Sequence, residues 1–142
     1  MQTTNTDLSP RLRLAITRTA RRLRQEADAG LSPSLTAALA TLERHGPLTP
    51  SRLAEIERIQ RPTVTRLLAA LERDGLVERV SDPTDGRVSI VSITRDGTAL
   101  VKKLRSRKNA YLSKRLRNLT HDELDALERA TAILERILEE PA

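Results

Sequence analysis

The sequence predicts a mainly α-helical fold that carries one small β-hairpin. Three observations support this prediction. Apolar residues recur every three or four positions over most of the chain, which is the period of a helix with one buried face. Two segments open with a capping residue followed by proline, a signature of helix starts. One stretch, residues 76–93, changes instead to the pattern of two strands joined by a turn.

Composition limits the class of protein and excludes several kinds of function. The chain has 142 residues, enough for one domain with its own core, and a single aromatic residue, so the core must be aliphatic. Its net charge of +6 favours nucleic acid or another anionic surface as a partner. The absence of cysteine excludes disulfides, thiol catalysis and thiol redox sensing.

No segment has the pattern of a targeting signal or a membrane anchor. The first ten residues carry no cation, and no apolar run reaches the roughly 18 residues of a membrane span. We therefore expect a cytoplasmic protein with no membrane partner. Two separate histidines provide no His/Cys metal site, and we expect no metal and no cofactor.

The N-terminal part of the chain predicts two helices. Residues 1–8 are polar, and we expect them to fray. A stripe of apolar residues at helical spacing then indicates a first helix over residues 11–29. Ser32 and Pro33 supply the N-cap and the first residue of a second helix, which extends to about Arg44.

The next segment combines two short helices with a tight turn. Thr49 and the proline after it begin a helix over residues 50–57. Residues 58–60 form a turn, and a further helix extends over residues 61–74 to a terminating Gly75. A short helix, a three-residue turn and a second helix make a helix-turn-helix.

A hairpin and two more helices complete the chain. Residues 76–80 and 88–93 have the pattern of strands, and the turn residues between them predict an antiparallel hairpin. Thr94 begins a long helix, and a capping box over residues 120–123 begins the last one. A hairpin directly after a helix-turn-helix makes a winged helix. We expect this DNA-binding lobe to cover residues 32–97.

The helix over residues 61–74 has two unlike faces, as expected of a recognition helix. Its apolar residues lie within one narrow arc that must face the core; they are Val64, Leu67, Leu68 and Leu71. The opposite face is small and basic, which suits close approach to a groove where Arg can bond guanine and Thr can touch bases or phosphate. The helix N-terminus also offers N–H groups to phosphate. The candidate DNA-contacting residues of this helix are Arg61, Pro62, Thr63, Thr65, Arg66, Ala69 and Arg73.

Residues 48–100 resemble the MarR family of bacterial transcriptional regulators. The matching segments are LAE (53–55), RPTVTRLL (61–68), LERDGLV (71–77), DPTDGR (82–87) and ITRDG (93–97). The resemblance implies that residues 1–142 form a single MarR-like domain. It also implies a homodimer whose helical dimerisation region comprises residues 11–29 and 100–138.

The resemblance assigns a role to the hairpin, whose wing we expect over residues 76–93. It implies that the tip enters the minor groove, where Asp85 holds the loop and Arg87 reaches the DNA. A narrow minor groove concentrates negative potential and attracts arginine. The chain departs from the family pattern at three positions. The family often has Gly in place of Arg58, Ser or Thr in place of Gln60, and Arg in place of Gly86.

The resemblance further implies regulation by a ligand. We expect a repressor that a small anionic or amphipathic effector releases from a pseudo-palindromic operator. The candidate effector-binding residues are Arg18, Arg22, His45 and Tyr111. Two of these residues have a structural interpretation as an alternative: His45 suits a helix C-terminus, and Tyr111 suits packing in an interface.

The last helix supports the dimer independently of the resemblance. Its apolar residues form a stripe too wide for one neighbouring helix; they are Leu124, Leu127, Ile133, Leu134, Ile137 and Leu138. A monomer would expose this stripe, which soluble proteins rarely tolerate. We therefore expect a dimer with two-fold symmetry.

Charge runs leave one alternative function open. Residues 11–24 carry six Arg and residues 102–117 carry eight Lys or Arg, with no acid in either run, whereas residues 118–142 are mostly acidic. The chain could thus be a non-enzymatic helical interaction protein whose basic faces bind an acidic partner, or DNA without sequence preference. An enzyme is disfavoured because no phosphate loop, nucleophile arrangement or unpaired carboxylate couple is present. The lack of stacking aromatics disfavours RNA.

Overall fold

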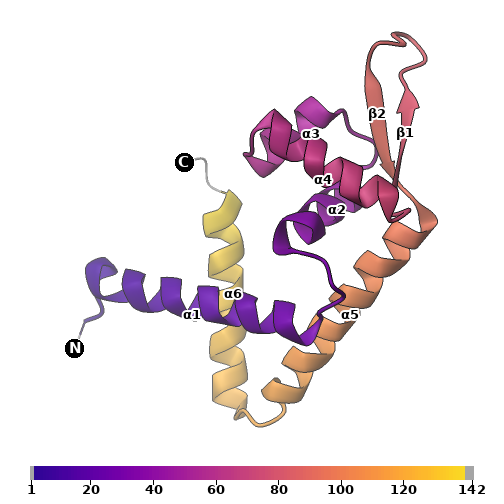
Figure 1. The fold of residues 1–142 in the computed structure, drawn as a ribbon. Coiled ribbons are helices and arrows are strands. Elements are labelled where there is room, and N and C mark those ends of the chain that lie inside the picture. Colours follow the sequence, from indigo (N-terminus) through magenta and orange to yellow (C-terminus); the bar gives the residue numbers. More distant parts are fainter. Residues whose placement is uncertain (1, 140–142) are drawn as a thin grey trace. The chain divides into compact units, whose positions relative to one another are not determined.

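The computed structural model describes residues 2–139 and confirms a mainly α fold with one β-hairpin (Figure 1). The elements in chain order are α1 (Asn5–Glu26), α2 (Pro33–His45), α3 (Pro50–Glu57), α4 (Arg61–Arg73), β1 (Val77–Ser81), β2 (Ser89–Ile93), α5 (Arg95–Leu116) and α6 (His121–Glu139). The chain divides into two compact units, Met1–Lys108 and Asn109–Ala142, with the boundary inside α5.

Helix α1 begins earlier than the sequence analysis predicted. Thr4 is its N-cap, since the Thr4 hydroxyl oxygen accepts a hydrogen bond of 3.2 Å from the backbone N–H of Asp7. The expectation that residues 1–8 fray is therefore wrong from Asn5 onward. The cap starts the helix ahead of Pro10, so the helix includes this proline. The helix also ends at Glu26 rather than at residue 29, and no side chain within it is buried.

The predicted starts of α2 and α3 are confirmed. The hydroxyl of Ser32 accepts a hydrogen bond of 3.2 Å from the N–H of Leu35, and the hydroxyl of Thr49 accepts one of 3.1 Å from the N–H of Arg52. Helix α4 begins differently, because Gln60 is its N-cap and makes no side-chain capping bond.

The hairpin is antiparallel, with Val77 opposite Ile93, and each strand begins one residue later than predicted. A further bridge links it to the segment before α3. The N–H of Leu48 donates to the Val91 carbonyl at 3.0 Å, and the N–H of Val91 donates to the Leu48 carbonyl at 2.8 Å. This pairing, which was not predicted from the sequence, ties the segment before the helix-turn-helix to the wing.

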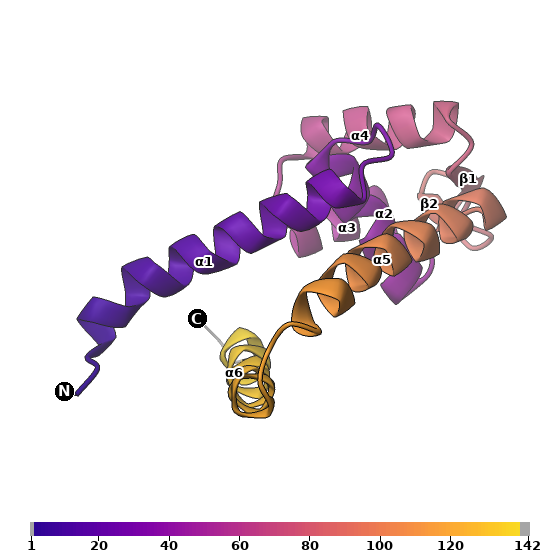
Figure 2. The same cartoon turned by 90° about the horizontal axis from the view of Figure 1, so that it is seen from below.

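The core of the first unit is aliphatic, as the composition predicts. It joins α2, α3, α4, the hairpin and the first turns of α5. Its largest fully buried side chains are Leu39, Leu42, Leu53, Val64, Leu68, Leu71 and Val91. Leu67, which the sequence analysis assigned to the core, is only half-buried. Figure 2 shows α2 lying between α4 and the first part of α5, so that α4 forms an outer edge of the lobe.

Helix α5 begins with a close backbone approach. The Thr94 hydroxyl accepts a hydrogen bond of 3.1 Å from the N–H of Gly97 and donates one of 2.7 Å to the carbonyl of Gly75. Gly97 is buried, and a Cβ added there would lie 2.2 Å from the Leu76 carbonyl oxygen. Glycine at position 97 thus lets α5 pack directly on the chain that leads into β1.

Helix α6 belongs to the second unit and begins with the predicted capping box. The Thr120 hydroxyl accepts from the N–H of Glu123 at 3.1 Å, and the Glu123 carboxylate accepts from the N–H of Thr120 at 3.0 Å. No side chain of α6 is buried. Its exposed large apolar residues are Leu124, Leu127, Ile133, Ile137 and Leu138.

Candidate nucleic-acid interface

Helix α4 is fixed to the lobe by one face and exposes the other. Val64, Leu68 and Leu71 are fully buried on the inner face. The outer residues that the sequence analysis selected are exposed, except for the half-buried Thr63; the exposed ones are Arg61, Pro62, Thr65, Arg66, Ala69 and Arg73. The structure therefore brings all of these candidates together on one helix, with small side chains between the basic ones.

The basic side chains of α4 make only weak or neutral contacts. A guanidinium nitrogen of Arg66 lies 3.4 Å from the Thr63 hydroxyl, and Arg61 donates to the hydroxyl of Ser51 in α3. Arg73 lies 3.8 Å from the carboxylate of Asp74. Within residues 2–139, no carboxylate pairs with Arg61 or Arg66. Their charge is thus available to an anion outside the chain.

The wing tip holds Asp85 and Arg87 together. One carboxylate oxygen of Asp85 accepts hydrogen bonds from the backbone N–H of Arg87 at 3.1 Å and from its Nε at 3.2 Å. The Arg87 side chain is nevertheless 93% exposed. The backbone bond fixes the loop, and the exposed guanidinium points its remaining donors to solvent.

A second aspartate stabilises the wing loop and was missed by the sequence analysis. One carboxylate oxygen of Asp82 accepts from the hydroxyl of Thr84 at 2.7 Å and from its backbone N–H at 2.8 Å. These bonds, led by the hydroxyl, hold the pKa of Asp82 below its ordinary value. The Asp-Pro-Thr sequence at residues 82–84 is a local signal for such an Asp turn.

An ion pair joins the wing to α4. The Nε of Arg79 in β1 lies 3.0 Å from a carboxylate oxygen of Glu72 near the end of α4. Together with the bridge between Leu48 and Val91, this contact ties the hairpin to α4 and to the segment that leads into α3. The exposed face of α4 and the wing tip are therefore held in a defined relation within one unit.

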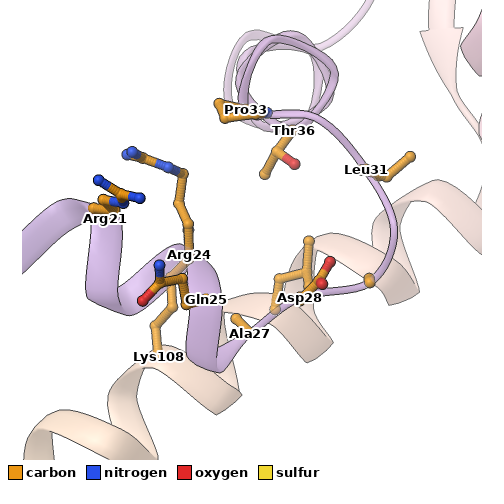
Figure 3. A pocket seen from close by; sticks show the side chains of 11 residues that line it. Arg21, Arg24, Gln25, Ala27, Asp28, Leu31, Pro33, Thr36 and Lys108 are labelled. Carbon is orange, nitrogen blue, oxygen red and sulfur yellow. The ribbon is translucent and has the colours of Figure 1, made fainter.

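A separate cavity of about 280 Å³ lies beside α1, α2 and α5 within the first unit (Figure 3). Its lining residues are Arg21, Arg24, Gln25, Ala27, Asp28, Ala29, Leu31, Pro33, Thr36, Leu104 and Lys108. Three cations against one carboxylate give the lining an excess of positive charge. Figure 3 shows Arg21 and Arg24 extending from α1 toward the start of α2.

None of the four predicted effector residues lines this cavity. Arg18 and Arg22 are exposed on α1, and Arg22 pairs with Glu26 at 3.0 Å. His45 is the last residue of α2, as the structural interpretation of that residue predicted. The guanidinium of Arg115 lies 5.2 Å from the ring centre of Tyr111, in the second unit. Helical spacing alone did not reveal that Arg21 and Arg24 line this cavity.

The part of the chain that the structure describes has neither a cluster of metal-ligating side chains nor a helix that could span a membrane. No group of three or more His, Asp or Glu side chains there could hold a metal ion. No helix there combines the length and the apolar character needed to cross a bilayer.

Comparison with known proteins places this geometry in a family. Residues 31–89 match the model of the MarR family. An uncharacterized HTH-type transcriptional regulator of Mycobacterium leprae is 37% identical over 134 residues, covering 94% of each chain. A putative transcriptional regulator of Pseudomonas aeruginosa, solved by crystallography, is 32% identical with a TM-score of 0.87, covering 98% of this chain and 100% of that one.

A third structure shares the fold at lower identity. A mutant of MepR from S. aureus, solved bound to an oligodeoxyribonucleotide, is 22% identical with a TM-score of 0.71, covering 97% of this chain and 100% of that one. Three findings indicate the same family. They are the identity and coverage of the mycobacterial relative, the family match over the helix-turn-helix, and the shared winged-helix fold. This chain belongs to the MarR family of DNA-binding transcriptional regulators, which are not enzymes.

Proposed function

We propose that the protein is a homodimeric repressor that binds a pseudo-palindromic operator through α4 and the wing. The observation that carries this proposal is the outer face of α4. Arg61 and Arg66 are exposed there without a carboxylate partner, while Val64 and Leu68 fix the helix by its other face. A helix held in this way can enter the major groove with little rearrangement.

The two parts of the surface differ in what they contribute. Arg66 lies in the first half of α4, where side chains of a recognition helix reach base edges. Arginine bonds guanine through two donors, so Arg66 is the proposed base-contacting residue. Arg61, Pro62, Thr63, Thr65, Ala69 and Arg73 complete the proposed DNA-facing surface. The MepR structure bound to an oligodeoxyribonucleotide supports this use of the fold by analogy.

The wing supplies the second proposed contact. The minor groove offers a degenerate pattern of donors and acceptors, so Arg87 adds charge there rather than sequence information. Asp85 limits the freedom of the loop through the backbone N–H of Arg87. We assign Asp85 as the positioning residue and Arg87 as the minor-groove residue.

Exposed apolar surface on the terminal helices supports the proposed dimer. We propose that residues 11–29 and 100–138 form the dimer interface, and that residues 32–97 form the DNA-binding lobe of a single MarR-like domain. Helices α1 and α6 bury no side chain in the isolated chain, although both carry apolar residues. Two lobes related by a two-fold axis would enter major grooves about one turn, or roughly 34 Å, apart.

The proposal also includes repression of transcription and release of the protein from its operator by a ligand. Occupying a promoter requires no further contact surface, which favours a repressor over an activator. The cavity beside α1 suits a small organic anion, since Arg21, Arg24 and Lys108 can pair with a carboxylate while Leu31 and Leu104 contact an apolar body. Ligand binding there would lower operator affinity, and such coupling typically amounts to about 1–3 kcal/mol.

The proposed DNA surface is tested on operators selected from random duplex DNA. Arg66→Ala should weaken the best operator by about 1–3 kcal/mol and relax preference at one position in each half-site. Arg87→Ala should weaken selected and scrambled duplexes alike and lower the salt slope by about 0.9. Arg44→Ala, an exposed arginine at the end of α2, is the matched control and should change neither.

Two outcomes would contradict these assignments. If Arg66→Ala weakened both duplexes equally while Arg87→Ala abolished discrimination, the roles of the two residues would be reversed. If neither variant altered binding, the winged-helix surface would not be the DNA site. The helical interaction protein with basic faces would then become the better interpretation.

The effector site is tested with a panel of small organic acids. Operator affinity should fall with at least one member, and Arg24→Ala should remove this response without changing affinity in the absence of the acid. Arg44→Ala serves as the control, since it removes an exposed arginine that lies outside the cavity and outside the proposed dimer interface. Constant affinity across the panel would indicate a constitutive repressor.

A further inference from the structure

Arg58 holds an unusual backbone conformation in the turn between α3 and α4. Its φ of 54° and ψ of 47° lie in the left-handed region, which glycine adopts freely and L side chains rarely adopt. The other positive-φ residues of the described chain are Gly30, Gly46 and Gly75. Within residues 2–139, position 58 is thus the one place where a side chain occupies this conformation.

The surrounding hydrogen bonds fix the turn. The N–H of Arg58 donates to the carbonyl of Glu55 at 3.3 Å, and the N–H of Ile59 donates to the carbonyl of Ala54 at 3.1 Å. Ile59 also packs against the core. The backbone on both sides of Arg58 is therefore held by contacts within the lobe.

The charge of Arg58 has no partner among the described residues. The two carboxylates nearest in sequence are already engaged. Glu55 pairs with Arg52 at 2.9 Å, and Glu57 accepts a hydrogen bond from Thr41 in α2. Arg58 is exposed and lies three residues before Arg61, where α4 begins.

We propose that Arg58 binds a backbone phosphate of the DNA, beside the groove that α4 enters. This inference rests on the proposed function of α4. A strained residue persists only where the surrounding structure imposes it, and such residues gather at functional sites. Here an arginine keeps a conformation that glycine would adopt without strain, on the approach to a basic helix start. Arg58 thereby contributes to DNA affinity while it lowers the stability of the fold.

Arg58→Gly tests this inference, because the substitution should raise the stability of the fold and lower the affinity for DNA. Relief of backbone strain should raise Tm by about 2–4 °C. Loss of one phosphate contact should weaken operator binding about 3–10-fold and lower the slope of log affinity against log salt by about 0.9. Arg58→Lys is the matched control, since it keeps both the charge and the strain; it should retain the salt slope without a rise in Tm.

Any other result for Arg58→Gly would contradict the proposed phosphate contact or the proposed strain. A rise in Tm with unchanged affinity and salt slope would show that Arg58 does not touch DNA, and a fall in Tm would show that its side chain stabilises the fold instead. Arg66→Ala, measured on the same operator, separates this inference from the function it rests on. If Arg66→Ala weakens binding and Arg58→Gly does not, only the inference fails. If neither does, the proposed DNA-binding face of α4 fails as well.

Discussion

Gly97 shows how a single residue fixes the junction between the wing and α5. A Cβ at this position would lie 2.2 Å from the Leu76 carbonyl oxygen and 2.7 Å from a side-chain carbon of Ile93. The carbonyl belongs to the backbone and accepts a hydrogen bond of 3.0 Å from the N–H of Thr94, so it cannot move without loss of that bond. The geometry leaves room only for hydrogen.

Gly97→Ala should therefore destabilise the protein even though alanine favours helices. Overpacking of this kind typically lowers the free energy of unfolding by about 1–3 kcal/mol, and equilibrium unfolding in urea measures the loss. Gly86→Ala is the control, because no atom lies within 4 Å of a Cβ there and Gly86 does not have a positive φ. Equal stability of Gly97→Ala and the wild type would show that α5 does not approach Leu76 this closely.

Asp82 makes the wing loop sensitive to pH. Its pKa is lowered from 3.8, chiefly by the Thr84 hydroxyl. A carboxyl group whose folded pKa lies below its unfolded pKa stabilises the loop above the unfolded value, and this contribution is lost as pH falls through the folded pKa. Thr84→Val should raise the pKa of Asp82 toward 3.8, as followed by an NMR titration of the carboxyl carbon. Thr84→Ser keeps the hydroxyl and should keep the low pKa. An unchanged titration in Thr84→Val would exclude the hydroxyl as the cause.

Among the candidate site residues, those whose exposure or burial depends on one helix were predictable. The exposure of Arg61 and Arg66 and the burial of Val64 follow from helical phase. Arg21 and Arg24 were missed as cavity residues because the cavity wall also includes α2 and α5, and its α5 residues, Leu104 and Lys108, are far away in sequence. Helical phase cannot identify a neighbour on another element.

Among the features of the fold, the starts of the helices were the most predictable, because the capping residues that mark them lie within a few positions of the start. The caps at Ser32 and Thr49 and the capping box at Thr120 lie where the sequence predicts them. The start of α1 was missed although Thr4 and Asp7 have the spacing of a capping box. The bridge between Leu48 and Val91 was missed for a different reason, since strand pairing over more than 40 residues leaves no local sequence signal.

Helix α4 is the element whose start is weakest. Gln60 provides no side-chain hydrogen bond, so no side-chain oxygen supplements the 3.0 Å bond from the N–H of Thr63 to the Gln60 carbonyl. Gln60→Ser should raise the free energy of unfolding by about 1 kcal/mol, measured by urea denaturation. Gln60→Ala removes the amide without supplying a cap and should not raise it. A gain in stability from Gln60→Ala equal to that from Gln60→Ser would show that the cap is not the reason.

At the scale of the whole molecule, the terminal helices leave apolar surface that the isolated chain does not cover. Leu127 and Ile133 of α6 are each 45% exposed, and Ile16 of α1 is 47% exposed. The core of the first unit, by contrast, is closed around α2, α3 and α4. This unit therefore contains its own core, whereas the apolar residues of α6 stay exposed.

Leu127→Asp should dissociate the proposed dimer while the lobe stays folded. In a two-fold interface the substitution acts on both copies, and each loses the burial of a leucine, worth about 1.5–3 kcal/mol, so the dimer dissociation constant should rise more than about 100-fold. Ala132→Asp is the matched control, because the residues three and four positions away on either side are charged: Glu128, Arg129, Glu135 and Arg136. Sedimentation should show monomers for Leu127→Asp and dimers for Ala132→Asp at micromolar concentration, with helical circular dichroism retained in both. The monomeric variant should also lose its preference for a full pseudo-palindrome over one half-site. A wild-type chain that sediments as a monomer at this concentration would refute the dimer, and a dimeric Leu127→Asp would place the interface elsewhere than on α6.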